Sequence, residues 1–146
     1  MKKIIFIAAG LAFVATTALA QKKEKIPPGP LDKKTFAVER VKDGKKKGTP
    51  EKEDLKFAAG KFSWSTMIQD GEYKPAAYEA TYDSTANPIT CAFTSEPQGD
   101  KDVVYKWEGT ITGDDIEGTA TLTKKGKVKE SYTFSGMIKG KKPKKE

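Results

Sequence analysis

The chain has 146 residues, a formal net charge of +7 at pH 7, one cysteine and no histidine. This length is enough for one domain. Without histidine, the chain lacks the commonest general base, the commonest metal ligand and every Ser–His or Cys–His nucleophile pair. No glycine-rich phosphate loop follows a predicted strand and opens a helix. We therefore expect a protein that is not an enzyme and that carries no cofactor and no metal.

The first twenty residues have the composition of an export signal. Lys2 and Lys3 provide a positive start, residues 4–14 are apolar, and residues 18–20 form a cleavage site with small residues at both ends. The apolar run is short for a membrane span, and a retained membrane anchor is the alternative interpretation. We expect removal of residues 1–20 as a signal peptide, which lowers the net charge from +7 to +5. The mature chain is then periplasmic or secreted, without a transmembrane span.

The single arginine and the single cysteine each limit the function. Arg40 is the only arginine, whereas specific reading of nucleic acids usually depends on bidentate arginine contacts, so we expect no specific nucleic-acid partner. Cys91 has no second cysteine with which to form an internal disulfide. Because it lies at an apolar position of a predicted strand, we interpret it as a small buried hydrophobic residue rather than a reactive thiol.

The chain after the signal begins with a polar, proline-rich stretch over residues 21–34, which we predict to be an extended tether. Short segments with alternating apolar and polar residues follow, separated by turns rich in Gly, Pro and Asp. This period of two is typical of half-buried strands. The first five predicted strands are residues 35–42, 54–58, 61–68, 76–82 and 89–95. In the third of them, the residues expected on one face are Phe62, Trp64, Thr66 and Ile68.

Residues 103–139 contain three further strands, whose alternation is regular enough to align them. A two-residue turn at Gly113–Asp114 places Ile111 opposite Ile116. The next turn, around Gly126, is expected to be longer. A slip of one residue would turn every aromatic side chain outward, so the parity is strongly specified. The rows expected on the inward face are Tyr105/Leu122/Tyr132, Trp107/Ala120/Phe134, Gly109/Gly118/Gly136 and Ile111/Ile116/Ile138.

Eight consecutive strands joined by short loops predict antiparallel neighbours. The predicted fold is all-β, an eight-stranded antiparallel up-and-down barrel over residues 35–139, whose interior is filled by side chains or by one small ligand. A two-sheet β-sandwich of the same strands is the alternative.

The closing strands carry the residue pattern of a known family. Trp107-x-Gly109-x-Ile111, followed by Tyr132-x-Phe134-x-Gly136, resembles the last strands of small secreted bacterial lipocalin-like proteins, which are calycin-type barrels. The resemblance covers roughly residues 35–139. The lipocalins proper also have a Gly-x-Trp on the first strand and a closing arginine, and this chain has neither. The resemblance implies a barrel that binds a small hydrophobic or amphipathic molecule.

The inward aromatic and glycine residues are the predicted ligand site. Aromatic side chains dominate buried area, so core packing is the alternative. Glycine in adjacent strands indicates either a bend at a barrel corner or space for a ligand or another backbone. The candidate ligand-binding residues are Trp64, Tyr78, Tyr105, Trp107, Gly109, Gly118, Tyr132 and Gly136.

Two charged clusters complete the candidate sites. Asp114, Asp115 and Glu117 lie at a hairpin tip, where a calcium site is one interpretation and a solvated turn is the favoured one. The basic tail, residues 140–146, is predicted either to contact an anionic surface such as lipid head groups or to be a solubilising end. Its candidate contact residues are Lys141, Lys142, Lys144 and Lys145.

Two functions remain open from the sequence. The first is a lipocalin-like protein that holds a small apolar ligand in its barrel. The second is a structural or interaction module of the cell envelope, with a packed core and a basic tail that contacts anionic surfaces.

Overall fold

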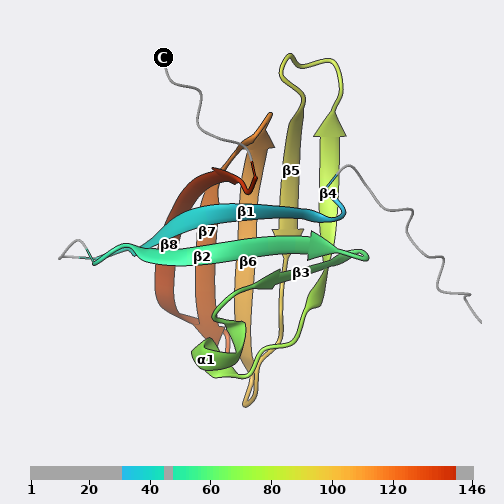
Figure 1. The fold of residues 1–146 in the computed structure, drawn as a ribbon. Coiled ribbons are helices and arrows are strands. Elements are labelled where there is room, and N and C mark those ends of the chain that lie inside the picture. The colour runs from blue at the N-terminus through green and yellow to red at the C-terminus, as the bar shows by residue number, and fades with distance from the viewer. Residues whose placement is uncertain (1–30, 45–47, 141–146) are drawn as a thin grey trace, which may run out of the picture.

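The computed structural model describes residues 31–44 and 48–140. Eight strands form one closed barrel in which each strand pairs antiparallel with the next and β1 pairs with β8 (Figure 1). This confirms the predicted barrel and excludes the sandwich. The elements are β1 (Lys34–Lys42), β2 (Glu51–Ala58), β3 (Lys61–Trp64), α1 (Met67–Gly71), β4 (Ala76–Asp83), β5 (Thr90–Ser95), β6 (Val103–Thr112), β7 (Asp115–Lys124) and β8 (Lys127–Ile138).

The alternation of side chains along each strand separates the core from the outer surface. In β1, Phe36, Val38 and Arg40 are buried, while the residues between them face outward. Successive side chains of a strand point to opposite faces, so apolar residues at every second position are enough to line the barrel interior. Within the described part of the chain, no helix is both long enough and apolar enough to span a membrane.

The third strand is shorter than predicted. β3 ends at Trp64, and the short helix α1 follows at residues 67–71. The predicted inward position of Ile68 is wrong, since this side chain is 73% exposed. The chain leaves the sheet here because Ser65 Oγ and the Thr66 backbone N–H both donate hydrogen bonds to Glu53 on β2. These contacts hold the residues after Trp64 across the end of the barrel instead of along its wall.

The β6–β7 register is confirmed, with Gly109 opposite Gly118 and Ile111 opposite Ile116. The predicted β7–β8 register is wrong by two residues, because Ala120 pairs with Tyr132 and Gly118 with Phe134. The turn between these strands is the tight one formed by Lys125 and Gly126, both with positive φ, instead of a longer loop.

A bulge keeps the aromatic side chains of β8 inside despite this tighter turn. Thr123 pairs with Val128 and Leu122 with Glu130, so Lys129 is an extra residue on β8. The tight turn alone would point the aromatic side chains of β8 outward, and the extra residue of the bulge turns them inward again. Gly136 consequently lies opposite Ile116 and not opposite Gly118, so the predicted row of three glycines does not form.

The barrel begins earlier than predicted. Leu31 is 2% exposed, and its backbone N–H donates a hydrogen bond of 3.3 Å to the hydroxyl of Tyr82. Lys34 is already part of β1. Residues 31–34 therefore belong to the barrel and not to a tether. The predicted signal peptide, residues 21–30 of the predicted tether and the four tail lysines from Lys141 to Lys145 lie outside the described residues.

Candidate functional site

The predicted ligand site lies in an interior that is filled by aromatic rings. Trp64, Tyr105 and Trp107 are buried, and their ring centres lie 5.2–5.3 Å from one another. Tyr132 joins this group at 6.4 Å from Tyr105. The structure thus brings together four of the predicted aromatic residues, in contact with each other.

The rings continue from this cluster towards the other end of the barrel. Phe62 lies 5.5 Å from Trp107 and 5.3 Å from Phe57, measured between ring centres. Phe57 in turn lies 5.0 Å from both Phe93 and Tyr78. Tyr78 therefore packs at the far end of the ring network, apart from the tryptophans with which it was grouped.

The inward glycines allow close packing of strands and rings. A Cβ atom at Gly118 would lie 2.7 Å from Cζ of Phe134, and one at Gly109 would lie 2.5 Å from the backbone oxygen of Glu117. At Gly136 a Cβ atom would overlap the backbone of Ala37 on β1. The space that these glycines leave is occupied by neighbouring backbone and by the ring of Phe134.

Arg40 is the buried central residue of a polar cluster at one end of the barrel. Its side chain is 4% exposed and comes from the inward face of β1. Nε and Nη2 donate to Oε2 of Glu51 at 3.1 and 2.6 Å. Nη1 donates to Asp70 of α1 at 3.1 Å and to the hydroxyl of Tyr105 at 2.9 Å. One guanidinium therefore connects β1, β2, β6 and α1.

A further acceptor, Glu53, and a second hydrogen bond to Asp70 anchor α1 to the same cluster. Glu53 is buried, lies 3.4 Å from Nη2 of Arg40, and accepts hydrogen bonds from Ser65 and Thr66. Asp70 also accepts a hydrogen bond of 2.7 Å from Nε1 of Trp64. A buried charge is tolerated when its hydrogen-bonding groups are satisfied, as they are for this arginine.

The pKa shifts follow from this burial and pairing. Burial alone would lower the pKa of Arg40, but the electrostatic interaction with Tyr105 and the hydrogen bonds to Glu51 and Asp70 raise it above its ordinary value. Burial raises the pKa of the Tyr105 hydroxyl well above 10, although Arg40 opposes the shift. The hydrogen bond from Lys42, together with that from Tyr132, lowers the pKa of Glu130. The cluster thus keeps Arg40 charged and Tyr105 neutral.

Sequence reasoning recorded Arg40 only as the single arginine and missed its position. The alternation of residues in β1 could have revealed this position, since Arg40 lies on the same inward side as Phe36 and Val38. Because its N–H groups are engaged by this chain's own acceptors, Arg40 closes the barrel end and does not present a free anion-binding group.

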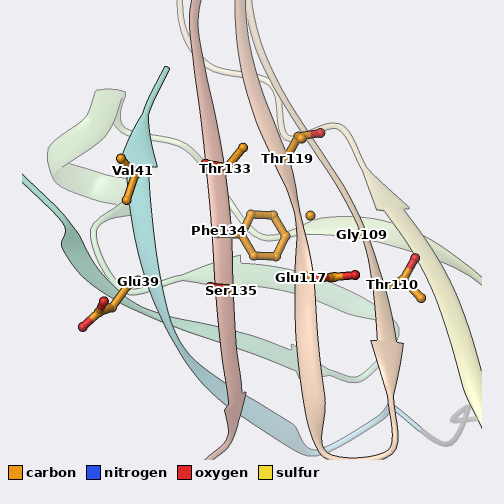
Figure 2. Close-up of a pocket in the computed structure, with 10 residues that line it drawn as sticks. Glu39, Val41, Gly109, Thr110, Glu117, Thr119, Thr133, Phe134 and Ser135 are labelled. Atoms are coloured by element: carbon orange, nitrogen blue, oxygen red, sulfur yellow. The ribbon is translucent and has the colours of Figure 1, made fainter. Parts of the chain in front are cut away.

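The outer wall carries a shallow depression of about 520 Å³ (Figure 2). Figure 2 shows the ring of Phe134 at its centre, next to Gly109, and this ring forms the buried floor of the depression. Its rim is polar and acidic, formed by Glu39, Thr110, Glu117, Thr119, Thr133 and Ser135. This surface offers hydroxyl and carboxylate groups.

The cysteine and the acidic hairpin tip add no reactive centre. Cys91 is buried, and burial raises the pKa of its thiol, which opposes thiolate formation. Asp115 and Glu117 are exposed on β7. Among the described residues, no group of three or more His, Cys, Asp and Glu side chains is arranged to hold a metal ion. No protein-family model, no curated protein and no solved structure matches this chain.

Proposed function

We propose that this chain is an exported interaction module of the bacterial cell envelope, whose lipocalin-like barrel is a rigid scaffold with a filled interior. The observation that supports this best is the series of ring contacts through the barrel, from Tyr132 by way of Tyr105 and Trp107 to Phe57. Side chains of the chain itself occupy the volume that a ligand would need. The outer wall and the two ends of the chain are then the parts available for contacts, and no catalytic role is proposed.

Export is the first part of the proposal and rests on residues 1–20. Expression of the full chain in a bacterial host, followed by N-terminal sequencing of the protein from the periplasm and the medium, tests it. We expect Gln21 as the first residue. Recovery of the uncleaved chain from the membrane fraction would favour a retained anchor instead.

The basic tail is the second part, because Lys141, Lys142, Lys144 and Lys145 are close together in a chain with net positive charge. The test is cosedimentation with phosphatidylglycerol-containing vesicles at low and high salt, using the chain that begins at Gln21. Truncation after Lys139 is expected to abolish the salt-sensitive binding, while neutral phosphatidylcholine vesicles bind neither form. Equal retention of both forms would contradict this part.

A small ligand inside the barrel is the second candidate, and one observation favours it. Nε1 of Trp107 is buried and has no hydrogen-bond partner among the described residues. A bound molecule with an acceptor group would satisfy it. Native mass spectrometry of protein from its own host, with tryptophan fluorescence during titration with oleate, distinguishes the candidates. Our proposal expects the mass of the chain alone and unchanged fluorescence, whereas an added mass favours the ligand carrier.

A further inference from the structure

β4 leaves part of the barrel wall unpaired. It pairs with β5 from Tyr78 to Asp83, but with β3 only through Ala76 and Ala77. One more hydrogen bond, 3.4 Å from the Tyr78 N–H to the oxygen of Gly60, ends this ladder at the β2–β3 turn. Figure 1 shows β4 and β5 continuing past that turn. Among the described residues, no strand pairs with this side of β4 beyond Tyr78.

The direction of the backbone groups makes this edge a template for another strand. Neighbouring residues of a strand point their N–H and C=O groups to opposite sides. Since the N–H of Tyr78 points towards β3, the N–H and C=O groups of Ala80 and Tyr82 point to the same, open side. Unpaired backbone groups in a row are the feature to which an extended peptide adds as a new strand.

The charges around the edge favour a cationic occupant. Glu79 and Asp83 are exposed on the outer face of β4. Independently of them, Oδ1 of Asp32 is buried and has no hydrogen-bond partner among the described residues. The residue before it, Leu31, lies against β4, because its backbone N–H donates a hydrogen bond of 3.3 Å to the hydroxyl of Tyr82. A buried carboxylate oxygen without a donor is costly, and an ammonium or N–H group from an added chain would supply the donor.

We propose that the open edge of β4 accepts an extended, cationic segment of a partner protein as an additional strand. Basic side chains at alternate positions of that segment lie opposite Glu79 and Asp83, and the intervening small apolar residues cover Ala80 and Tyr82. A second copy of this chain fits less well, because antiparallel pairing of two β4 strands about Thr81 would place Glu79 opposite Asp83 of the other copy. This inference goes beyond the role of the tail, and either can fail without the other.

Amide hydrogen exchange measured by NMR on residues 21–146 tests the proposal. The probe is a seven-residue peptide, blocked at both ends, that alternates lysine and valine; the control peptide alternates glutamate and valine. In the free protein, the amides of Ala80 and Tyr82 should exchange fast, while that of Thr81, which faces β5, is protected. The lysine peptide should slow exchange at Ala80 and Tyr82 at least tenfold, and the glutamate peptide should not.

Two variants identify the contacts. Ala80→Pro removes one open-side N–H at an edge position where proline is tolerated, so binding of the lysine peptide should be lost. The double variant Glu79→Lys/Asp83→Lys should weaken binding by about three- to tenfold, the size expected for two cross-strand pairs. The double variant Asp115→Lys/Glu117→Lys, at two exposed positions of β7, makes the same change in net charge and is the control that should bind normally. The charge variants leave the backbone unchanged, so their peptide binding still tests the proposal if Ala80→Pro fails to fold.

Three results would overturn the proposal. The first is protection of the Ala80 and Tyr82 amides in the free protein that disappears when residues 21–30 are deleted, which would assign the edge to this chain's own N-terminal segment. The second is protection that grows with protein concentration, which would assign it to a second copy. The third is equal slowing by both peptides, or by neither.

Discussion

The guanidinium carbon of Arg40 lies 4.7 Å from the ring centre of Tyr132. These residues come from β1 and β8, the first and last strands, whose pairing closes the barrel. A cation over an aromatic face is stabilising, and the same guanidinium also bonds to Glu51, Asp70 and Tyr105. Closure of the barrel at this end therefore depends on one buried charge and its partners.

Arg40→Met should strongly destabilise the fold. The substitution leaves Glu53 buried beside an apolar side chain, and loss of one partner of a buried pair typically costs about 3–5 kcal/mol. Urea unfolding followed by tryptophan fluorescence measures the change in the free energy of unfolding. The control is Lys42→Met, which removes the exposed ion pair with Glu130 and should cost no more than about 1 kcal/mol. Equal losses in both variants would contradict the central role of Arg40.

Trp64→Phe and Trp107→Phe should differ although both indoles are buried. Nε1 of Trp64 donates a hydrogen bond of 2.7 Å to Asp70, whereas Nε1 of Trp107 has no partner among the described residues. Replacing Trp64 loses that bond, but replacing Trp107 removes an unsatisfied donor, so Trp64→Phe should cost about 1–3 kcal/mol more. Chemical denaturation of the two variants measures the difference in their free energies of unfolding. A larger loss for Trp107→Phe would indicate that its N–H does have a partner, as the ligand candidate requires.

Gly118→Ala should destabilise the barrel by about 1–3 kcal/mol, the usual cost of inserting atoms into a packed core. The new methyl group would overlap the backbone of β6 and the ring of Phe134. Gly48→Ala is the matched control, because there the added Cβ atom meets only Lys42, at 3.4 Å. Melting temperatures of the two variants provide the comparison. Tolerance of Gly118→Ala would mean that free space exists beside Phe134.

Tyrosine ionisation should be suppressed throughout the folded barrel. The chain has five tyrosines, and burial raises the pKa of each one above its usual value of 10.0, in the case of Tyr82 to about 12. The folded state then binds more protons than the unfolded state above about pH 10, so stability is complete below that pH and falls as the pH rises further.

Ultraviolet absorbance of the phenolate measures this directly. The folded protein should show no tyrosine that titrates near pH 10, and the ionisation should coincide with alkaline unfolding seen by circular dichroism. In concentrated guanidinium chloride, all five tyrosines should titrate near 10. Normal titration of one or more tyrosines in the folded protein would show that those side chains are solvated, and the assigned packing would be wrong there.

The sequence alone was enough to identify the number of strands, the face that each strand turns inward and the β6–β7 register. These properties are local. Alternation has a period of two, and the tight turn at Gly113 leaves one register that keeps Trp107 and Ile111 inside. The buried aromatic residues and the buried position of Cys91 follow from the same parity.

Only the tertiary structure decided the features that depend on contacts between distant residues. The tight turn and the bulge at Lys129 together shift β8 by two residues along β7, relative to the predicted register. A shift of two residues leaves the same side chains pointing inward, so the alternation of apolar and polar residues could not reveal it. β3 ended early because Ser65 and Thr66 donate hydrogen bonds to Glu53, which lies 12 and 13 positions away in the sequence. Arg40 is buried with acceptors 11, 30 and 65 positions away. Periodicity reports which way a side chain points, whereas the partner it meets is set by how the barrel closes.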